Sequence, residues 1–97
     1  MFVVTLRFSA NRAEAARHMD GHDAWIRRGF EDGVFLLAGS LPGSAGGAVL
    51  AHGISRDDLD ARLREDPFVA EQVVEADILE IAPGRVDDRL AFLRGAR

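Results

Sequence analysis

The sequence predicts an α+β fold of the ferredoxin-like class, with elements in the order β-α-β-β-α-β. The first observation is a period-two alternation of apolar side chains in residues 2–8, which is typical of a strand. The second is a set of three further apolar runs of strand length, at residues 34–41, 48–53 and 73–81. Two stretches with helical spacing lie between these runs, so we expect one four-stranded antiparallel sheet with two helices on one face.

The stretch after the first strand follows a helical pattern that Asp20 and Gly21 interrupt. Aspartate is a good N-cap, so a short turn or helix near residues 13–18 is expected to precede a main helix over residues 21–31. Gly33 is well placed to cap the C-terminal end of this main helix, because glycine readily adopts the left-handed conformation found there.

Residues 34–41 are apolar on both faces, which for a strand means that both sides are covered. The loop at residues 42–47 is rich in turn-forming residues and leads into the next apolar run, so the two strands are predicted to form a hairpin. The loop does not resemble a phosphate-binding loop, because it lacks the Lys-Ser/Thr pair and a strand follows it instead of a helix.

Ser55 is expected to cap the second helix, in which Leu59 and Leu63 lie four residues apart and face the core. Proline disfavours helical geometry at the residue before it. Because Pro67 follows Asp66, this helix is predicted to end at Asp66 or just before it.

The chain of 97 residues is expected to be a single domain, with a core over about residues 2–83 and a tail, 84–97, that contains a short amphipathic helix. Two helices can cover only one face of a four-stranded sheet. The other face carries Leu, Val or Phe side chains on its middle strands, and so large an exposed apolar surface usually marks an interface. We therefore expect a homodimer in which the two sheets face each other.

A net charge of -4 without a single lysine argues against a nucleic-acid partner, because phosphates are neutralised by Lys and Arg. No apolar run approaches the roughly 20 residues that span a bilayer, so no membrane contact is expected and the location is predicted to be cytoplasmic. The absence of cysteine excludes disulfides and thiolate metal sites. His18 and His22 have metal-ligand spacing, but Gly21 lies between them and no third ligand is evident, so neither a metal nor another cofactor is expected.

His22 follows Met19 by three residues and precedes Ile26 by four, so it shares their inward helix face. A half-buried imidazole needs a hydrogen-bond partner and can exchange protons near neutral pH, which suits a general acid or base. The alternative is a core histidine that is hydrogen-bonded in the interior without any chemical role. Access to a cavity separates the two, because a catalytic imidazole must reach its substrate.

At the C-terminal end of a helix, Asp66 would lie against the helix dipole, which disfavours a carboxylate there by some tenths of a kcal/mol. A contact with His22 would compensate, with the carboxylate orienting the imidazole and stabilising its protonated form. Alternatively, Asp66 forms a turn with the backbone beyond Pro67. The two roles are compatible.

Arg7 lies on the less apolar face of the first strand. Its guanidinium could project into a cavity between the two sheets and bind a carboxylate or phenolate of a substrate, or it could pair with Glu75 or Asp77 on the last strand. Trp25, three residues after His22, could form the wall of a pocket for a planar ligand or could pack in the core.

The chain carries, in this order, a helical His22, Gly33 with the strand VFLLAG, a glycine-containing hairpin, a second helix and the tripeptide Asp66-Pro67-Phe68. In their order and spacing these features resemble the YciI-like (YCII-related) family, and the resemblance covers about residues 2–83. It implies a dimeric α+β barrel. It also places His22 in the family's proposed active site, with Asp66 as its partner.

The family includes a dehydrochlorinase that acts on a chlorinated hydroxyquinol. The resemblance therefore implies lyase-type chemistry, with His22 as general acid or base and Asp66 as its orienting partner, on a small aromatic or enolisable molecule. Ser40 stands where the family often has proline, and it could add a hydroxyl to the lip of the substrate pocket. Two alternatives remain open: a non-catalytic dimeric module that binds a small ligand, and a structural dimer subunit in which His22 is only a core residue.

Overall fold

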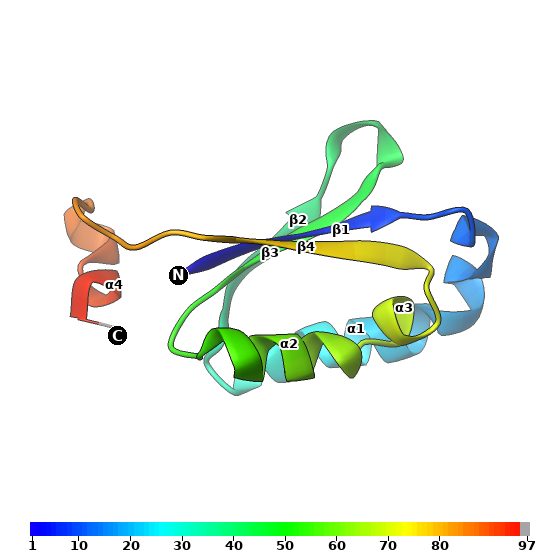
Figure 1. The fold of residues 1–97 in the computed structure, drawn as a ribbon, viewed down its shortest axis with the longest axis horizontal. Helices are drawn as coiled ribbons and strands as arrows, with labels where there is room; N and C mark the ends of the chain where they lie inside the picture. Colours follow the sequence, from blue (N-terminus) through cyan, green and yellow to red (C-terminus); the bar gives the residue numbers. More distant parts are fainter. Residues whose placement is uncertain (96–97) are drawn as a thin grey trace.

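The computed structural model describes residues 1–95 and has the predicted ferredoxin-like α+β architecture (Figure 1). All strand pairs are antiparallel, and the sheet order is β2-β3-β1-β4. The strands are β1 (Phe2–Phe8), β2 (Phe35–Ser40), β3 (Gly46–Ala51) and β4 (Val74–Glu80). Helices α1 (Ala15–Glu31), α2 (Arg56–Arg64) and α3 (Pro67–Ala70) all lie on one face of this sheet.

Helix α1 is continuous, so the predicted break at Asp20 and Gly21 is wrong. A 3-10 turn, Arg12–Glu14, leads directly into the helix, which runs through both residues to Glu31. The reason for the glycine is packing: a Cβ atom at Gly21 would lie 2.9 Å from Cγ of Pro67 in α3. The glycine therefore allows a neighbouring helix to approach closely, and it does not end a helix.

The C-terminal end of α1 has the predicted glycine cap. Gly33 has a φ of 74°, and its N–H donates to the carbonyl of Phe30 at 3.0 Å. The N–H of Val34 donates to the carbonyl of Gly29 at 2.9 Å. This pair of bonds is a Schellman motif, and it turns the chain from α1 into β2.

Strands β2 and β3 form the predicted hairpin around a turn at Pro42–Ser44. A bulge between Phe35 and Leu37 inserts one extra residue into β2. Gly46, with φ of 137°, begins β3 where a Cβ atom would overlap the carbonyl oxygen of Leu6 in β1. The hairpin and β1 can therefore come this close only because residue 46 has no side chain.

Ser55 caps α2 as predicted, because its hydroxyl accepts the N–H of Asp58 at 3.1 Å. Leu59 and Leu63 of this helix are both buried in the core, also as predicted. The short helix α3 that follows is not predicted by the sequence reasoning. Helix α2 ends at Arg64, just before Asp66, as predicted. Asp66 itself is the N-cap of α3, so the chain starts a new helix where proline indicated only a stop.

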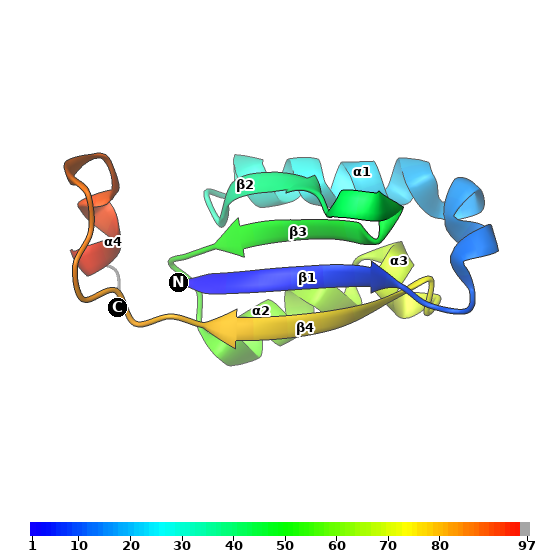
Figure 2. The ribbon, with the colours of Figure 1, turned by 90° about the horizontal axis from the view of Figure 1, so that it is seen from above.

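The core lies between the helices and one face of the sheet, where the side chains of Val4, Trp25 and Val49 are fully or almost fully buried. The opposite face carries an apolar row across all four strands. In this row Leu37 pairs with Leu50, Leu50 with Val3, and Val3 with Leu79. Leu37 of β2 is 54% exposed and Leu79 of β4 is 61% exposed. Within one chain this face of the sheet is therefore uncovered, and β2 is covered on only one of the two sides that its apolar sequence predicts. Figure 2 looks onto this face, with the helices behind the sheet.

The tail leaves the sheet after β4 and lies beyond its end, apart from the helical layer (Figures 1 and 2). The predicted amphipathic helix is two short pieces, a 3-10 turn at Asp88–Leu90 and the one-turn helix α4 (Phe92–Gly95). The ring of Phe92 packs edge-on against His52 at 5.3 Å. Residues 96–97 lie outside the described part of the chain.

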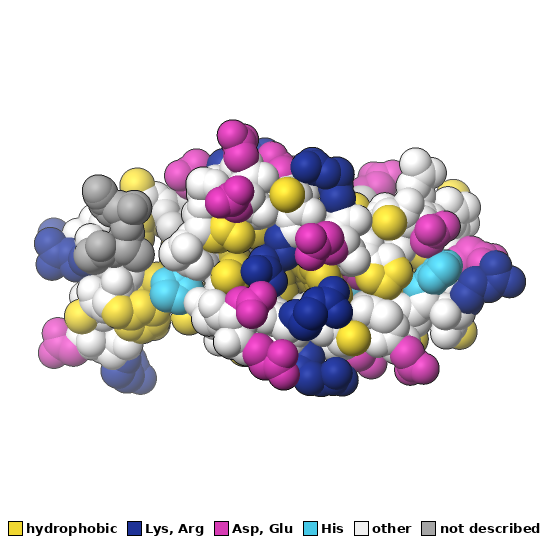
Figure 3. Space-filling model, turned by 90° about the horizontal axis from the view of Figure 1, so that it is seen from below, with side chains coloured by type: hydrophobic (Ala, Val, Ile, Leu, Met, Phe, Trp, Pro, Cys, Tyr) yellow, Lys and Arg dark blue, Asp and Glu magenta, His cyan; other side chains and the backbone are white. Residues whose placement is uncertain are grey.

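The helix-covered side has acidic and basic side chains interspersed over its surface (Figure 3). Within the tail, hydrogen bonds from the side chain and backbone of Arg89 hold the pKa of the Asp87 carboxyl below its usual value. Among residues 1–95, no helix is both long enough and apolar enough to cross a membrane.

Candidate active site

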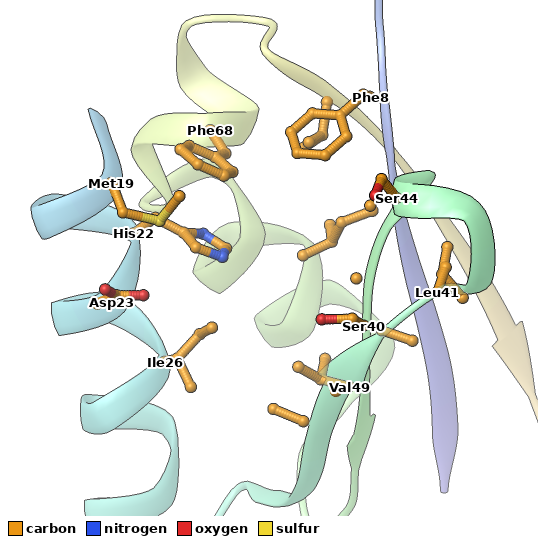
Figure 4. A pocket seen from close by; sticks show the side chains of 17 residues that line it. Phe8, Met19, His22, Asp23, Ile26, Ser40, Leu41, Ser44, Val49 and Phe68 are labelled. Carbon is orange, nitrogen blue, oxygen red and sulfur yellow. The ribbon is translucent and has the colours of Figure 1, made fainter. Parts of the chain in front are cut away.

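A cavity of about 520 Å³ lies between α1 and the β2–β3 hairpin, with Phe68 of α3 at one end (Figure 4). Its walls are mainly apolar. Met19, His22 and Ile26 line it from α1, as their spacing along one helix face predicts. The cavity is large enough for a single small aromatic molecule.

His22 and Asp66, 44 residues apart in sequence, are in hydrogen-bond contact in this structure. Nδ1 of His22 lies 2.9 Å from Oδ1 of Asp66. The imidazole is 13% exposed and the carboxylate is completely buried. The imidazole ring therefore stands between the cavity and a buried carboxylate, which is the order that a proton-transfer pair requires.

The predicted cause of this contact, an unfavourable helix dipole at Asp66, is wrong. Asp66 does not oppose a helix dipole, because it precedes α3 and its Oδ1 accepts the N–H of Phe68 at 3.0 Å. An N-cap is a favourable place for a carboxylate. The turn and the pairing with His22 were treated as compatible alternatives, and the structure has both of them on the same oxygen atom.

The hydrogen bonds of Asp66 indicate where His22 carries its proton. Oδ1 already accepts a backbone N–H from Phe68, so it also acts as acceptor toward His22, and Nδ1 of the imidazole is the donor. Nε2 makes no hydrogen bond with any residue in the range 1–95. In the neutral ring Nε2 therefore has the free lone pair, and it is the atom that can accept a proton from a ligand. Oδ2 of Asp66 is buried and has no partner among the same residues.

Two aromatic rings hold the plane of the imidazole. The ring of Phe68 stacks on His22 with centroids 4.0 Å apart and 5° between the planes. Trp25 lies behind at 6.1 Å, with 24° between the planes. Together with the bond to Asp66, these contacts restrict rotation of the imidazole, so Nε2 keeps one direction toward the cavity (Figure 4).

Trp25 does not line the cavity; of the two alternatives that the sequence left open, the structure has the packing in the core. Its Nε1–H donates to the carbonyl of Arg62 at 2.8 Å. The edge of its ring also packs against Phe35 at 5.1 Å. Helical spacing from His22 put Trp25 on the inward side of α1, but this residue points into the core and not into the cavity.

Arg7 is also absent from the cavity. Leu6 and Phe8 line the cavity from β1, so the alternation of a strand places Arg7 on the opposite face of the sheet. There it is exposed, and it forms no ion pair with Glu75, with Asp77 or with another residue in the range 1–95. The predicted ion pair is therefore absent. The open face of the sheet is the face that a cavity between two sheets would need, so the substrate contact of Arg7 stays a prediction.

Ser40 lines the cavity at the end of β2, and its hydroxyl points inward (Figure 4). Asp23 and Phe68 also line it, although the sequence reasoning assigned neither of them to a site. Asp23 was considered only as part of a helix start, and Phe68 only as part of a tripeptide motif. Their positions beside His22 and Asp66 were the available signal, since neighbours of a site residue often share its surroundings.

The lining is electrostatically one-sided. Asp23 contributes a carboxylate, and no lysine or arginine is among the residues that line the cavity. Within residues 1–95, no three His, Cys, Asp or Glu side chains come together as ligands for a metal ion. The polar groups available to a ligand are therefore the imidazole, the hydroxyls of Ser40 and Ser44, one carboxylate and backbone groups of the hairpin.

No protein-family model matches this sequence, and no curated protein is similar to it at a significant level. Among solved structures, the chain is similar to 5-chloro-2-hydroxyhydroquinone dehydrochlorinase (TftG) from Burkholderia phenoliruptrix AC1100, determined in complex with 2,5-dihydroxybenzoquinone. The TM-score is 0.68 at 14% sequence identity, and the match covers 87% of this chain and 96% of that chain. At this level of identity the similarity is one of fold: the chain has the ferredoxin-like α+β fold of that dehydrochlorinase.

Proposed function

We propose that this chain is a small lyase-type enzyme of the YciI-like family, in which His22 acts as general acid and base on a small hydroxylated ring compound. The observation that carries the proposal is the 2.9 Å contact between Nδ1 of His22 and the buried carboxylate of Asp66, which leaves Nε2 free at the wall of a cavity. The fold shared with a dehydrochlorinase supports the same reaction class.

The reaction removes HCl from a chlorinated, hydroxylated ring without any change in the overall oxidation level. Nε2 of His22 takes the proton of a ring hydroxyl and returns it to the carbon that bears chlorine, which becomes a saturated carbon next to a new C=O bond. Nε2 then takes the proton of a second hydroxyl. The electron pair of that O–H bond forms a second C=O bond, the ring double bond shifts, and the C–Cl bond breaks to release chloride. One imidazole serves both steps, since it alternates between acid and base.

Asp66 acts through His22 and does not touch the cavity, so it is a positioning residue. When Nε2 takes a proton, the imidazole becomes a cation 2.9 Å from a buried carboxylate. That neighbour stabilises the cation and keeps Nδ1 as the donor, as in other His-Asp pairs.

The charge of the lining favours neutral, hydroxylated ligands. A carboxylate or phosphate group would meet Asp23 and no positive side chain in the cavity. A hydroxyl that ionises only by giving its proton to His22 has a matched partner, because the phenolate and the imidazolium form together. Ser40 can hydrogen-bond a further hydroxyl of the ring.

The binding test compares hydroxyhydroquinone with a dihydroxybenzoate of similar size, by calorimetric titration under nitrogen. We expect the neutral triol to bind at least roughly fivefold more tightly, because one like-charge contact costs about 1 kcal/mol or more at a partly buried site. His22→Gln should weaken binding of the triol, whereas His18→Gln, on the same helix but outside the cavity, should not. Equal affinity for the carboxylate would contradict this ligand class.

We propose in addition that two copies of the chain associate through the open face of the sheet. The support is the row formed by Val3, Leu37, Leu50 and Leu79, which crosses all four strands and leaves large apolar side chains in solvent in a single chain. A two-fold axis through this face would place each row against its copy and bury both.

A further inference from the structure

Gly21 has an unfavourable position for a residue of its type. It lies inside α1, immediately before His22, where glycine is among the least favourable residues for a helix. The three atoms that an added Cβ would meet all belong to Pro67, at 2.9, 3.8 and 3.9 Å. Pro67 has a rigid ring that cannot swing aside as a long side chain can.

The contact between Gly21 and Pro67 is the direct neighbour of the contact between His22 and Asp66. On α1, Gly21 precedes His22; on α3, Asp66 precedes Pro67. The two helices therefore meet through two adjacent residue pairs, one a van der Waals contact and one a hydrogen bond. The first pair sets how closely α3 can approach, and the second pair depends on that approach.

We infer that Gly21 is a positioning residue for the His22–Asp66 pair, because its missing side chain allows Pro67 to seat α3 against α1. The bond from Phe68 N–H to Oδ1 ties the carboxylate to the start of α3. A displacement of Pro67 therefore moves the carboxylate as well as the Phe68 ring that stacks on His22. The inference rests on the proposed function only for its catalytic meaning, since the hydrogen bond can be measured without any substrate.

The test uses Gly21→Ala, Pro67→Ala and the double variant, with nitrogen and proton NMR of the His22 ring. In the wild type we expect a proton on Nδ1, with a hydrogen-bonded signal and one ring tautomer. Gly21→Ala should lose that signal and give a mixture of tautomers. Pro67→Ala alone should keep it, because Asp66 still caps the helix.

The double variant gives the rescue. Alanine at position 67 keeps the Cβ atom, which would lie 3.8 Å from the Cβ of residue 21, an ordinary contact distance, and it removes the Cγ atom at 2.9 Å. The Nδ1 signal should therefore return. Gly84→Ala is the matched control, since a Cβ there meets nothing within 4 Å and the signal should be unchanged.

Two results would overturn the inference. One is a Gly21→Ala protein that keeps the wild-type Nδ1 signal. The other is a double variant that does not recover the Nδ1 signal lost in Gly21→Ala. If Gly21→Ala fails to fold, the corresponding result is a double variant that also fails to fold. With a substrate that the wild type converts, Gly21→Ala should lower kcat on the order of 10²-fold and change KM little. The double variant should recover the wild-type kcat. If no variant, wild type included, shows turnover while the NMR pattern holds, the positioning role stands and the proposed function fails.

Discussion

The imidazole of His22 and the phenyl ring of Phe68 are stacked, with centroids 4.0 Å apart and only 5° between their planes. Phe68 belongs to α3, the same four-residue helix whose N-cap, Asp66, holds Nδ1 of the imidazole. The hydrogen bond and the closer of the two stacked rings thus come from one short element. The orientation of Nε2 toward the cavity depends on the placement of α3 more than on α1, which carries the histidine.

Asp66→Asn should separate the structural role of this residue from its electrostatic role. The amide oxygen can still accept the N–H of Phe68 and cap α3, so the free energy of unfolding should fall by less than about 1 kcal/mol. Asp66→Ala removes the cap and leaves the His22 donor unpaired, which should cost about 1 to 3 kcal/mol. Urea unfolding measures both values.

The effects of Asp66→Asn and Asp66→Ala on kcat should not follow the order of their effects on stability. Both variants lose the negative charge beside the imidazole, so both should reduce kcat by about 10- to 100-fold. Wild-type turnover in Asp66→Asn would show that the carboxylate has no catalytic role. Asp57→Asn, in the exposed first turn of α2, is the control for a change of charge alone.

His22→Ala should destabilise the protein, because it leaves the completely buried Asp66 without its side-chain donor. A loss of about 1 to 3 kcal/mol is expected from the unpaired carboxylate. In a domain of this size, that corresponds to roughly 4 to 8 °C in Tm for each kcal/mol. Thermal unfolding beside His18→Ala, which should change Tm little, measures the effect. An unchanged Tm for His22→Ala would mean that the pair is not formed in solution.

Trp25→Phe tests whether this residue belongs to the core and not to the cavity. The variant keeps the aromatic packing against Phe35 but loses the bond from Nε1 to the carbonyl of Arg62. We expect a stability loss of about 1 to 3 kcal/mol in urea, since the carbonyl of Arg62 keeps only the N–H of Glu65 as a donor and the smaller ring leaves a void in the core. Affinity for hydroxyhydroquinone should stay at the wild-type value. A large drop in affinity at unchanged stability would indicate that Trp25 contacts the ligand.

The proposed dimer predicts that wild type sediments as a dimer at micromolar concentration. Leu37→Glu places a charge in the apolar row of the open sheet face and should give a folded monomer, because Leu37 is outside the core of its own chain. Leu90→Glu changes a similarly exposed leucine in the tail and should remain dimeric. A wild type that sediments as a monomer would contradict the proposed association through the open sheet face.

Much of the fold follows from local patterns. The alternation in β1, the glycine loop of the hairpin, the Ser55 cap and the Gly33 cap each involve residues close in sequence, so their geometry is set by nearby backbone and side chains. The facing of Leu59 and Leu63 follows from helical spacing alone. These elements were predicted within a few residues of their observed bounds.

Most of the errors concern contacts between distant segments. Gly21 was taken for a helix break because its reason, Pro67, lies 46 positions further along the chain. Asp66-Pro67 correctly indicates the end of α2 just before Asp66, but the same dipeptide also suits the start of a helix, with Asp as N-cap and Pro at its first position, and this start was not predicted. Trp25 could not be assigned because helical spacing shows which side is inward but not whether that side meets core or cavity.

The most direct test of the central claim is chloride release from 5-chloro-2-hydroxyhydroquinone by wild type, His22→Gln and His18→Gln. We predict that the wild type releases one chloride per molecule of hydroxybenzoquinone formed, that His18→Gln keeps this rate, and that folded His22→Gln loses about 10²- to 10⁴-fold, the usual contribution of a general acid or base. Chloride release by His22→Gln at the wild-type rate, or a wild type that binds the compound and releases none, would contradict the account.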